Sequence, residues 1–259
     1  MLLAMDVGNS NIKVGLFEEE KLISSFRITT NADRSSDEYG LLIIHFLSYL
    51  NRTADEIEGV IIATVQPQLR YTLDRMTHTF FRCHPIFVSY QLNLGIKLKY
   101  DSLPALGADR IANAVAGYEL YGGNGACITV DFGTATTYDL VDATGAFVSG
   151  VTAPGIRISA KALWEDAAKL PEIEIKKPDS ILAKETITSM QAGLVYGQIG
   201  QTEYIVKRMR KESGFDNMKV VATGGLGKMI YENTDCIDTY DPDLTLYGLR
   251  IIMDKQKQA

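Results

Sequence analysis

Hydrophobic residues recur along this chain with two different periods, and those periods predict its secondary structure. Three short apolar or alternating runs near the start predict β-strands at 2–6, 11–17 and 21–28. The capping residues Ser35 to Glu38 precede apolar positions spaced i, i+3, i+4 and i+7, which predicts a helix over about 37–50 with one buried face. The β-branched run 60–65 predicts a strand inside a parallel sheet.

Pro67 opens a helix and 85–88 forms a short strand, and these two elements complete the first half. The same order of elements then starts again in the second half, with three strands at 126–131, 135–142 and 146–151. A helix after Pro154-Gly155, a long helix near 188–212, a strand at 220–222 and two final helical stretches complete the chain. Three strands followed by βα units, twice over, predict an α/β protein with two mixed sheets flanked by helices.

A short motif is also duplicated, and it follows the first strand of each half. The chain reads Asp6-Val7-Gly8-Asn9-Ser10 and, about half its length later, Asp131-Phe132-Gly133-Thr134. This repetition indicates an internal duplication and predicts two domains, 1–120 and 121–259. Each glycine lets the backbone turn tightly and approach a ligand, while hydroxyl and N–H groups form an anion-binding concavity. Two facing hairpins of this kind can clamp the phosphates of a nucleotide.

Composition narrows the class of protein. Of 259 residues, 46% are hydrophobic and 22% charged, which is typical of a soluble globular protein with a proper core. A net charge of −6 without a long basic run argues against nonspecific nucleic-acid binding. Three scattered cysteines without C-x-x-C spacing suggest reduced thiols. Because neither a signal sequence nor a membrane span is recognisable, we expect a cytoplasmic location and no membrane partner.

A third motif, Gly107-Ala108-Asp109-Arg110, lies between the two halves and opens an alanine-rich helix. An aspartate in a first turn is commonly only favourable for the helix dipole. The small residues Gly107 and Ala108 nevertheless leave room for a ligand. Asp109 beside Arg110 would also place a possible general base next to a guanidinium that binds carboxylates. Both interpretations stay open on the residues alone.

With these motifs the chain closely resembles the type III pantothenate kinases, which are members of the acetate kinase/hexokinase/Hsp70/actin superfamily. The matching segments run in family order and are Asp6 to Ser10, Gly107 to Arg110, Asp131-Phe132-Gly133-Thr134-Ala135-Thr136-Thr137, Pro154-Gly155, and Thr223-Gly224-Gly225-Leu226. The resemblance implies the duplicated ribonuclease H-like, actin-like ATPase fold. It also implies phosphorylation of pantothenate by ATP, the first step towards coenzyme A.

The resemblance further implies a role for individual residues. Asp109 is the general base, and Asp131 ligates a monovalent cation, K⁺ or NH₄⁺. Asp6 helps to place Mg²⁺ through water. ATP is bound by Asp6, Val7, Gly8, Asn9, Ser10, Asn11, Ile12, Lys13 and Thr134, with Thr223-Gly224-Gly225 near the adenosine. Pantothenate is held by Tyr100, Gly107, Ala108, Asp109, Arg110 and Thr186.

Two departures from the family pattern concern these sites. Ser149-Gly150 stands where Gly-Gly is usual before the Pro-Gly turn, with Thr152 where an aliphatic residue is common. Glu185 precedes Thr186 where an Asn often stands. The first departure leaves the packing around Pro154 open. The second lies next to Thr186, so the assignment of Thr186 to the pantothenate site rests on the other matching motifs.

Other functions remain as alternatives. The chain lacks the G-x-x-x-x-G-K-[ST] loop and the protein-kinase signatures, so its nucleotide site requires another scaffold. A sugar or acetate kinase of the same superfamily would share the duplicated hairpins but not Gly-Ala-Asp-Arg. An accessory transcriptional regulator of the same family would be expected to lose the base or a phosphate loop, yet Asp109, Gly8 and Gly133 are all present. An actin-like filament protein is a further alternative.

Glycines on the long predicted helix suggest how the chain assembles. Gly193, Gly197 and Gly200 are spaced i, i+4 and i+7, and each costs helix stability of roughly 1 kcal/mol relative to alanine. Something therefore packs close to them, either another helix or a second subunit, and the spacing alone favours a contact within the chain. The family resemblance instead implies a homodimer whose pantothenate sites straddle the interface. Asp109 of one chain would then work with Thr186 of the other.

Overall fold

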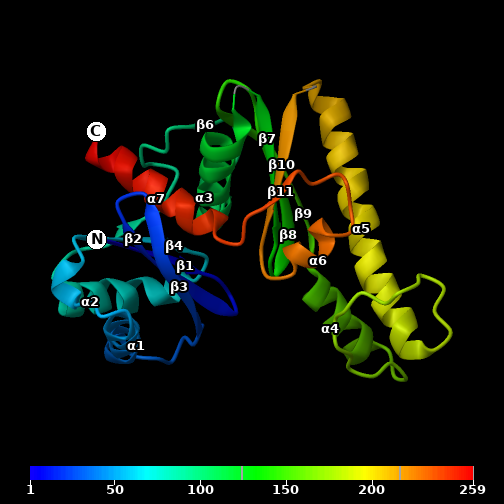
Figure 1. Ribbon diagram of the computed structural model, residues 1–259, viewed down its shortest axis with the longest axis horizontal. Coiled ribbons are helices and arrows are strands. Elements are labelled where there is room, and N and C mark those ends of the chain that lie inside the picture. Colours follow the sequence, from blue (N-terminus) through cyan, green and yellow to red (C-terminus); the bar gives the residue numbers. More distant parts are fainter. Residues whose placement is uncertain (124, 216, 259) are drawn as a thin grey trace. The chain divides into compact units, whose positions relative to one another are not determined.

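The computed structural model describes residues 1–123, 125–215 and 217–258. Its contacts divide the chain into two compact units, and each is described here by itself (Figure 1). The first unit comprises Met1–Ile96, Asp101–Ala116 and the C-terminal segment from Leu244; the second comprises Lys97–Tyr100 and Gly117–Asp243. The C-terminal segment therefore belongs to the unit that contains the N-terminus. The expected division into two domains, 1–120 and 121–259, stays a prediction.

The first unit is built on a five-stranded mixed sheet with the order β3-β2-β1-β4-β5. β1 pairs antiparallel with β2, which pairs antiparallel with β3, while β1–β4 and β4–β5 are parallel. The three strands expected from the early apolar runs and the strand at 60–65 are thus confirmed. The strand bounds are Leu2–Val7 (β1), Asn11–Glu18 (β2), Lys21–Thr29 (β3), Gly59–Thr64 (β4) and Ile86–Phe87 (β5).

Four α-helices belong to this unit, and they bury its apolar side chains. The predicted capping of α1 is confirmed: the Glu38 N–H donates to the Ser35 hydroxyl at 3.2 Å, and the Ser35 N–H donates to the Glu38 carboxylate at 2.8 Å. α1 and α2 share a core with the sheet, while α7 packs against β1, β4 and α3. The helix bounds are Ser36–Tyr49 (α1), Arg70–Phe81 (α2), Ala108–Ala116 (α3) and Leu244–Lys257 (α7).

The second unit repeats this sheet and extends it by one strand. Its order is β11-β10-β7-β8-β9-β6, so β9-β8-β7-β10-β11 corresponds to β3-β2-β1-β4-β5. Parallel and antiparallel pairings also correspond. The predicted fold class, a duplicated arrangement of two mixed sheets flanked by helices, is confirmed. The bounds are Lys97–Leu98 (β6), Ala126–Phe132 (β7), Ala135–Val141 (β8), Ala146–Pro154 (β9), Met218–Thr223 (β10) and Thr239–Tyr240 (β11).

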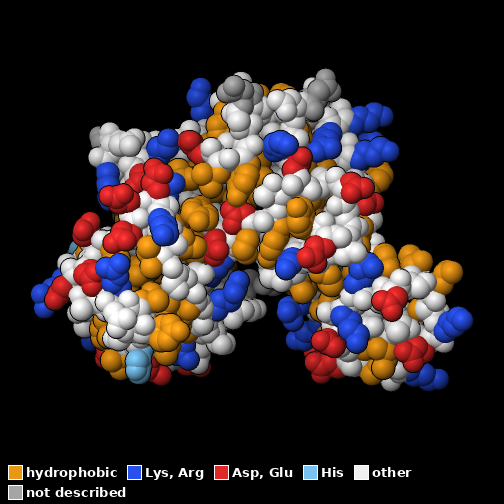
Figure 2. Space-filling model, viewed as in Figure 1, with side chains coloured by type: hydrophobic (Ala, Val, Ile, Leu, Met, Phe, Trp, Pro, Cys, Tyr) orange, Lys and Arg blue, Asp and Glu red, His pale blue; other side chains and the backbone are white. Residues whose placement is uncertain are grey.

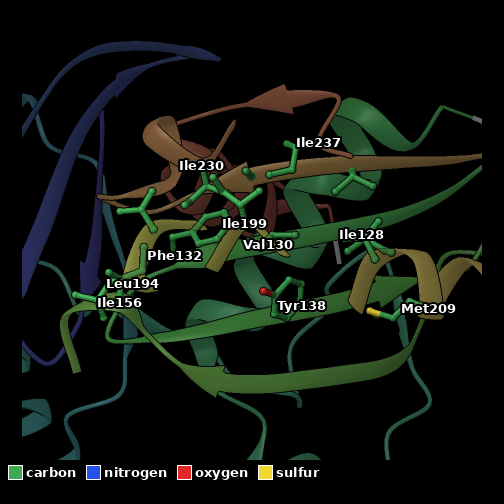
Figure 3. Close-up of a cluster of buried hydrophobic side chains, with 14 of the residues drawn as sticks. Ile128, Val130, Phe132, Tyr138, Ile156, Leu194, Ile199, Met209, Ile230 and Ile237 are labelled. Atoms are coloured by element: carbon green, nitrogen blue, oxygen red, sulfur yellow. The ribbon is translucent and has the colours of Figure 1, made fainter. Parts of the chain in front are cut away.

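The core of the second unit lies between its sheet and the long helix. The helices are α4 (Ile156–Asp166), α5 (Thr186–Ser213) and α6 (Gly227–Tyr231). Buried side chains of β7 and β8 meet residues of α5 and α6 in one cluster (Figure 3). Tyr138 is the only tyrosine among the labelled side chains, and its hydroxyl lies 3.0 Å from the Thr202 hydroxyl of α5. Its polar group is thereby satisfied inside the core, which fixes α5 against β8.

The glycine face of α5 corrects one expectation. A Cβ built on Gly193, Gly197 or Gly200 would meet no atom within 4 Å. Among the described residues of the chain, nothing packs closely on these glycines, so the expected contact within the chain is wrong. Spacing on a helix shows which residues share a face but does not show what covers that face.

The surface charge, the hydrophobicity of the helices and the state of the cysteines complete the description. On the face shown in Figure 2, Lys and Arg side chains are interspersed with Asp and Glu, so neither sign dominates there. The described part of the chain contains no helix with the length and hydrophobicity that a bilayer crossing requires. All three cysteines are free thiols; Cys127 is buried, and burial raises its pKa to about 12, with the Asp238 charge adding to the shift.

Candidate active site

The first hairpin motif forms a well-braced turn between β1 and β2. Asp6 lies opposite Lys13 in the register of the two strands, and Val7 lies opposite Ile12. The Gly8 N–H donates to the Asn11 carbonyl at 3.0 Å, and the Thr30 hydroxyl donates to the Gly8 carbonyl at 2.9 Å. The tip of the turn, Asn9 to Asn11, is exposed. The structure therefore brings all eight residues expected to contact ATP in the first unit onto one hairpin.

The second hairpin motif joins β7 to β8 in the same way. Asp131 lies opposite Thr137, and the Gly133 N–H donates to the Ala135 carbonyl at 3.1 Å. Gly155, at the start of α4, donates its N–H to the Thr134 carbonyl at 3.2 Å. A Cβ on Gly155 would lie only 2.6 Å from the Gly133 carbonyl oxygen. Thus the Pro-Gly motif brings the start of α4 against the hairpin, which requires glycine at that position.

The departure at Ser149-Gly150 leaves this arrangement intact. β9 continues through Ser149, Gly150 and Thr152 to Pro154, which pairs with Ala135 of β8. The strand is irregular only further back, where the register shifts between Leu140 and Val141 of its neighbour β8. The packing around Pro154 that the sequence left open is therefore a regular strand end.

The two motif aspartates occupy corresponding positions of the duplicated sheets. Asp6 is near the end of β1, between Lys13 of β2 and Ala63 of β4. Asp131 is near the end of β7, between β8 and β10, where it lies opposite Thr223. Both aspartates are half-buried. In each unit, a carboxylate thus stands beside a glycine turn at the carboxyl end of the central parallel strand, where ligands bind in open α/β sheets.

Asp131 is in direct contact with the glycine turn that follows β10. Gly224 has a positive φ of +91°, and a Cβ on it would lie 2.6 Å from Asp131 Oδ1 and 2.7 Å from the backbone of Phe132. Only glycine fits this position without strain. The Thr223-Gly224-Gly225 motif and the Asp131 motif, far apart in sequence, therefore form one continuous surface within the second unit.

The Gly-Ala-Asp-Arg motif forms the start of α3 in the first unit. The Asp109 carboxylate bends back over its own helix turn, where Oδ1 accepts the Arg110 N–H at 2.9 Å. A Cβ on Gly107 would collide with that carboxylate, so Gly107 is required for this orientation. Burial raises the pKa of Asp109 above its ordinary value, although the Arg110 N–H and guanidinium favour the ionised form. A carboxyl group with a raised pKa is a stronger base once deprotonated.

The C-terminal helix supports α3, a relationship that sequence reasoning missed. The Thr245 hydroxyl of α7 donates to the Asn113 side-chain oxygen of α3 at 2.8 Å, and both residues are buried. Gly248 lies so close to the Ala112 carbonyl that a Cβ would collide with it. These contacts hold the helix that carries Asp109. A local sign of this contact in the sequence is Gly248, a glycine inside α7.

The two remaining residues expected to contact pantothenate belong to the second unit. Tyr100 follows β6, and its ring packs edge-on against Phe147 with centroids 5.5 Å apart. Thr186 is the first residue of α5 and is exposed. The structure therefore brings Gly107, Ala108, Asp109 and Arg110 together at the start of α3 in the first unit, and it places Tyr100 after β6 and Thr186 on α5, both in the second.

The carboxylate of the second hairpin is a ligand of the kind that hard cations accept. Among the residues that the structure describes, no group of three or more His, Cys, Asp or Glu side chains could hold a metal ion. Asp131 supplies a carboxylate oxygen, the kind of ligand that K⁺ and Mg²⁺ accept. The missing Cβ of Gly224 keeps space open against that oxygen. These observations fit a weakly held cation beside Asp131.

Comparison with known sequences decides the family. A family model for type III pantothenate kinase matches residues 2–208. A curated type III pantothenate kinase from Agathobacter rectalis is 54% identical over 258 residues, covering 100% of this chain and 98% of its own length. The chain belongs to the type III pantothenate kinase family. The kinase thus carries the family motifs on the elements described above.

Solved structures agree with this fold. A conserved putative Baf family transcriptional activator from Campylobacter jejuni is 21% identical, with a TM-score of 0.60 over 99% of this kinase and 100% of that chain. Component A of the (R)-2-hydroxyglutaryl-CoA dehydratase of Acidaminococcus fermentans is 12% identical, with a TM-score of 0.54 over 99% and 98%. At these identities, the likeness concerns the duplicated fold alone.

Proposed function

We propose a residue-level account of how this kinase transfers a phosphoryl group from ATP to the hydroxyl of pantothenate, the first step of coenzyme A biosynthesis. The observation that carries the account is Asp109, which is half-buried at the first turn of α3 with a raised pKa. In this account, Asp109 accepts the proton of the pantothenate hydroxyl as the oxygen attacks the phosphorus. Phosphoryl transfer otherwise depends on alignment and on neutralising charge.

The two hairpins bind the phosphates of ATP in this account. Exposed backbone groups and the side chains of Asn9, Ser10 and Asn11 line the first hairpin, and Lys13 adds a positive charge opposite Asp6. Thr134 contributes the equivalent hydroxyl from the second hairpin. Asp6 would hold Mg²⁺ through water, and this ion neutralises charge that develops on the phosphate oxygens. Because the hairpins are braced internally, their donors are already oriented before ATP binds.

Asp131 would hold the monovalent cation, K⁺ or NH₄⁺. A carboxylate beside a phosphate-binding turn repels ATP unless a positive charge lies between them. Asp131 is the carboxylate of the second hairpin, and its Oδ1 is in contact with Gly224. The cation would therefore join the Asp131 turn and the Thr223-Gly224-Gly225 turn, which we place near the adenosine of ATP.

Pantothenate is an acid, and the start of α3 offers a matching group. The guanidinium of Arg110 can bind a carboxylate through two parallel hydrogen bonds. Gly107 and Ala108 are small residues beside it, and we propose that they complete the pantothenate site together with Tyr100 and Thr186. Arg110 would fix one end of the substrate, so that the hydroxyl at its other end meets Asp109.

A homodimer explains the open glycine face of α5. Thr186, Gly193, Gly197, Gly200 and Tyr204 follow one another at intervals of seven, four, three and four residues, which places them on one face of the helix. No described residue of the chain comes within 4 Å of a Cβ built on any of the three glycines, and Tyr204 is 65% exposed. We propose that a second copy packs on this face, so that Thr186 of one chain reaches the pantothenate site of its partner.

The activity is tested by acceptor choice. The purified kinase is incubated with ATP and Mg²⁺ in K⁺ buffer with pantothenate, acetate or glucose, and ADP release and the phosphorylated product are measured. We expect product from pantothenate alone. Transfer to acetate or glucose would favour another kinase of the superfamily, and no transfer to any acceptor would favour the accessory regulator.

A further inference from the structure

Tyr240 contacts the glycine turn that lies against Asp131. Its hydroxyl donates a hydrogen bond to the Gly224 carbonyl at 3.0 Å, across a separation of 16 residues. The same carbonyl accepts the N–H of Gly227 at 3.2 Å. The Gly224 carbonyl is thus held by one bond from its own turn and by one from a side chain of a different strand.

The ring of Tyr240 is itself held in place. β11, which contains Tyr240, pairs with β10 so that Tyr240 lies opposite Ala222. Gly227 lies flat against the ring, since a Cβ there would be 2.8 Å from Tyr240 Cε2. The ring of Tyr231 stacks alongside at 6.3 Å with an angle of 25°. The hydroxyl therefore approaches Gly224 from a fixed direction.

The same turn also touches the proposed cation ligand. The Cα of Gly224 lies against Asp131 Oδ1 and the Phe132 backbone, with φ at +91°. Glycine is the most flexible residue, so its backbone does not hold such a conformation by itself. The Tyr240 hydrogen bond supplies a constraint on the Gly224 carbonyl.

We propose that Tyr240 is a positioning residue for nucleotide and cation binding, acting through the Gly224 turn on the carboxylate of Asp131. This inference rests on the proposed roles of Asp131 and the Gly224 turn. Without the hydroxyl, Gly224 can rotate its peptide, and the space between its Cα and Asp131 Oδ1 changes. Both the cation and the adenosine would then bind a less well-defined surface.

The test uses Tyr240→Phe with a matched control. Phenylalanine keeps the ring between Gly227 and Tyr231 and removes only the hydroxyl. Tyr231→Phe removes a hydroxyl from the neighbouring stacked ring. The Tyr231 hydroxyl makes no hydrogen bond among the described residues. For each protein we measure the Kd of Mg-ADP by isothermal titration calorimetry with and without K⁺, the K⁺ concentration for half-maximal activity, KM for pantothenate, and Tm.

The loss of one oriented hydrogen bond predicts a roughly three- to tenfold increase in the Kd of Mg-ADP for Tyr240→Phe. We expect a similar rise in the half-maximal K⁺ concentration, with KM for pantothenate unchanged. Tyr231→Phe should match the wild type in all of these. A role in stability alone would lower Tm while leaving Mg-ADP and K⁺ affinities unchanged, and that result would overturn the inference.

The same measurements separate this inference from the proposed cation site. If the wild type binds Mg-ADP and turns over equally well without K⁺, the cation role of Asp131 is wrong. The Kd of Mg-ADP then decides the role of Tyr240 by itself: a selective increase in Tyr240→Phe supports it, and equal values in both variants contradict it.

Discussion

Gly224 lies in van der Waals contact with the carboxylate of Asp131, so that a Cβ on Gly224 would be 2.6 Å from Asp131 Oδ1. The two residues belong to motifs that are 93 positions apart in the printed sequence, at the ends of the adjacent parallel strands β7 and β10. Their contact turns two separate glycine motifs into one surface. It also makes this surface sensitive to a single methyl group.

We therefore expect Gly224→Ala to destabilise the kinase by about 2–4 kcal/mol, because the positive φ and the collision with Asp131 and Phe132 add to each other. Urea unfolding measures this change. Gly225→Ala is the matched control, since a Cβ there would meet no atom within 4 Å; its effect should stay within about 0.5 kcal/mol. Equal effects of the two substitutions would contradict the described contact.

The raised pKa of Asp109 predicts how stability depends on pH. The folded chain binds this proton more tightly than the unfolded chain, so the wild type loses stability as pH rises through the Asp109 pKa. Asp109→Asn removes this titration and keeps an oxygen that can accept the Arg110 N–H. We expect the variant to be more stable than the wild type at neutral pH, with the difference vanishing below the ordinary aspartate pKa of about 3.9.

Unfolding in urea at a series of pH values measures this difference. A stability difference that is constant with pH would show that Asp109 titrates in the folded chain as it does in the unfolded one. A variant less stable at neutral pH would show that the ionised carboxylate is favoured in the fold, contrary to the effect of burial.

The local pattern of the sequence was sufficient for most of the fold. Strands and helices followed from periodicity, because each such signal lies within a few residues. The duplicated sheets followed from the two Asp-x-Gly turns, because each turn is a local motif that can be recognised by itself. β6 and β11 were missed, whereas the equally short β5 was found through the run 85–88. The packing of α7 on α3 was missed because its hydrogen bond from Thr245 to Asn113 spans 132 positions.

In the candidate site too, local motifs could be predicted from the sequence and contacts between distant residues could not. The hairpin glycines and Gly-Ala-Asp-Arg are visible in sequence because each forms a local turn. The contact of Gly224 with Asp131 is not visible, since it depends on β10 lying parallel to β7. The shared face of the α5 glycines was predicted correctly, but the expected contact within the chain was wrong, because spacing does not show what packs on a helix face.

The proposed cation predicts a strict buffer requirement. Because Asp131 would otherwise repel the phosphates of ATP, turnover should be low in Na⁺ or Tris buffer free of K⁺ and ammonium, and either ion should restore it. Asp131→Asn should lose this response together with most of its turnover. Full wild-type activity in K⁺-free buffer would remove the cation from the account.

The shared pantothenate site predicts recovery between two inactive variants. Asp109→Asn and Thr186→Arg are purified separately, then unfolded and refolded together. In a mixed dimer, one site carries both defects and the other carries none, so random pairing should restore about a quarter of wild-type activity. No recovery despite demonstrated chain exchange, or a monomer in solution, would contradict the shared site.

The role of Asp109 is tested most directly by the turnover of Asp109→Asn with pantothenate, ATP, Mg²⁺ and K⁺ at saturating concentrations across a pH series. We predict a kcat lower by about 10²–10⁴-fold. The wild-type rate should fall on the acid side with a pKa above the ordinary aspartate value, and this limb should be absent in the variant. A purified, folded Asp109→Asn that keeps a near-normal kcat with the same acid limb would show that Asp109 is not the base.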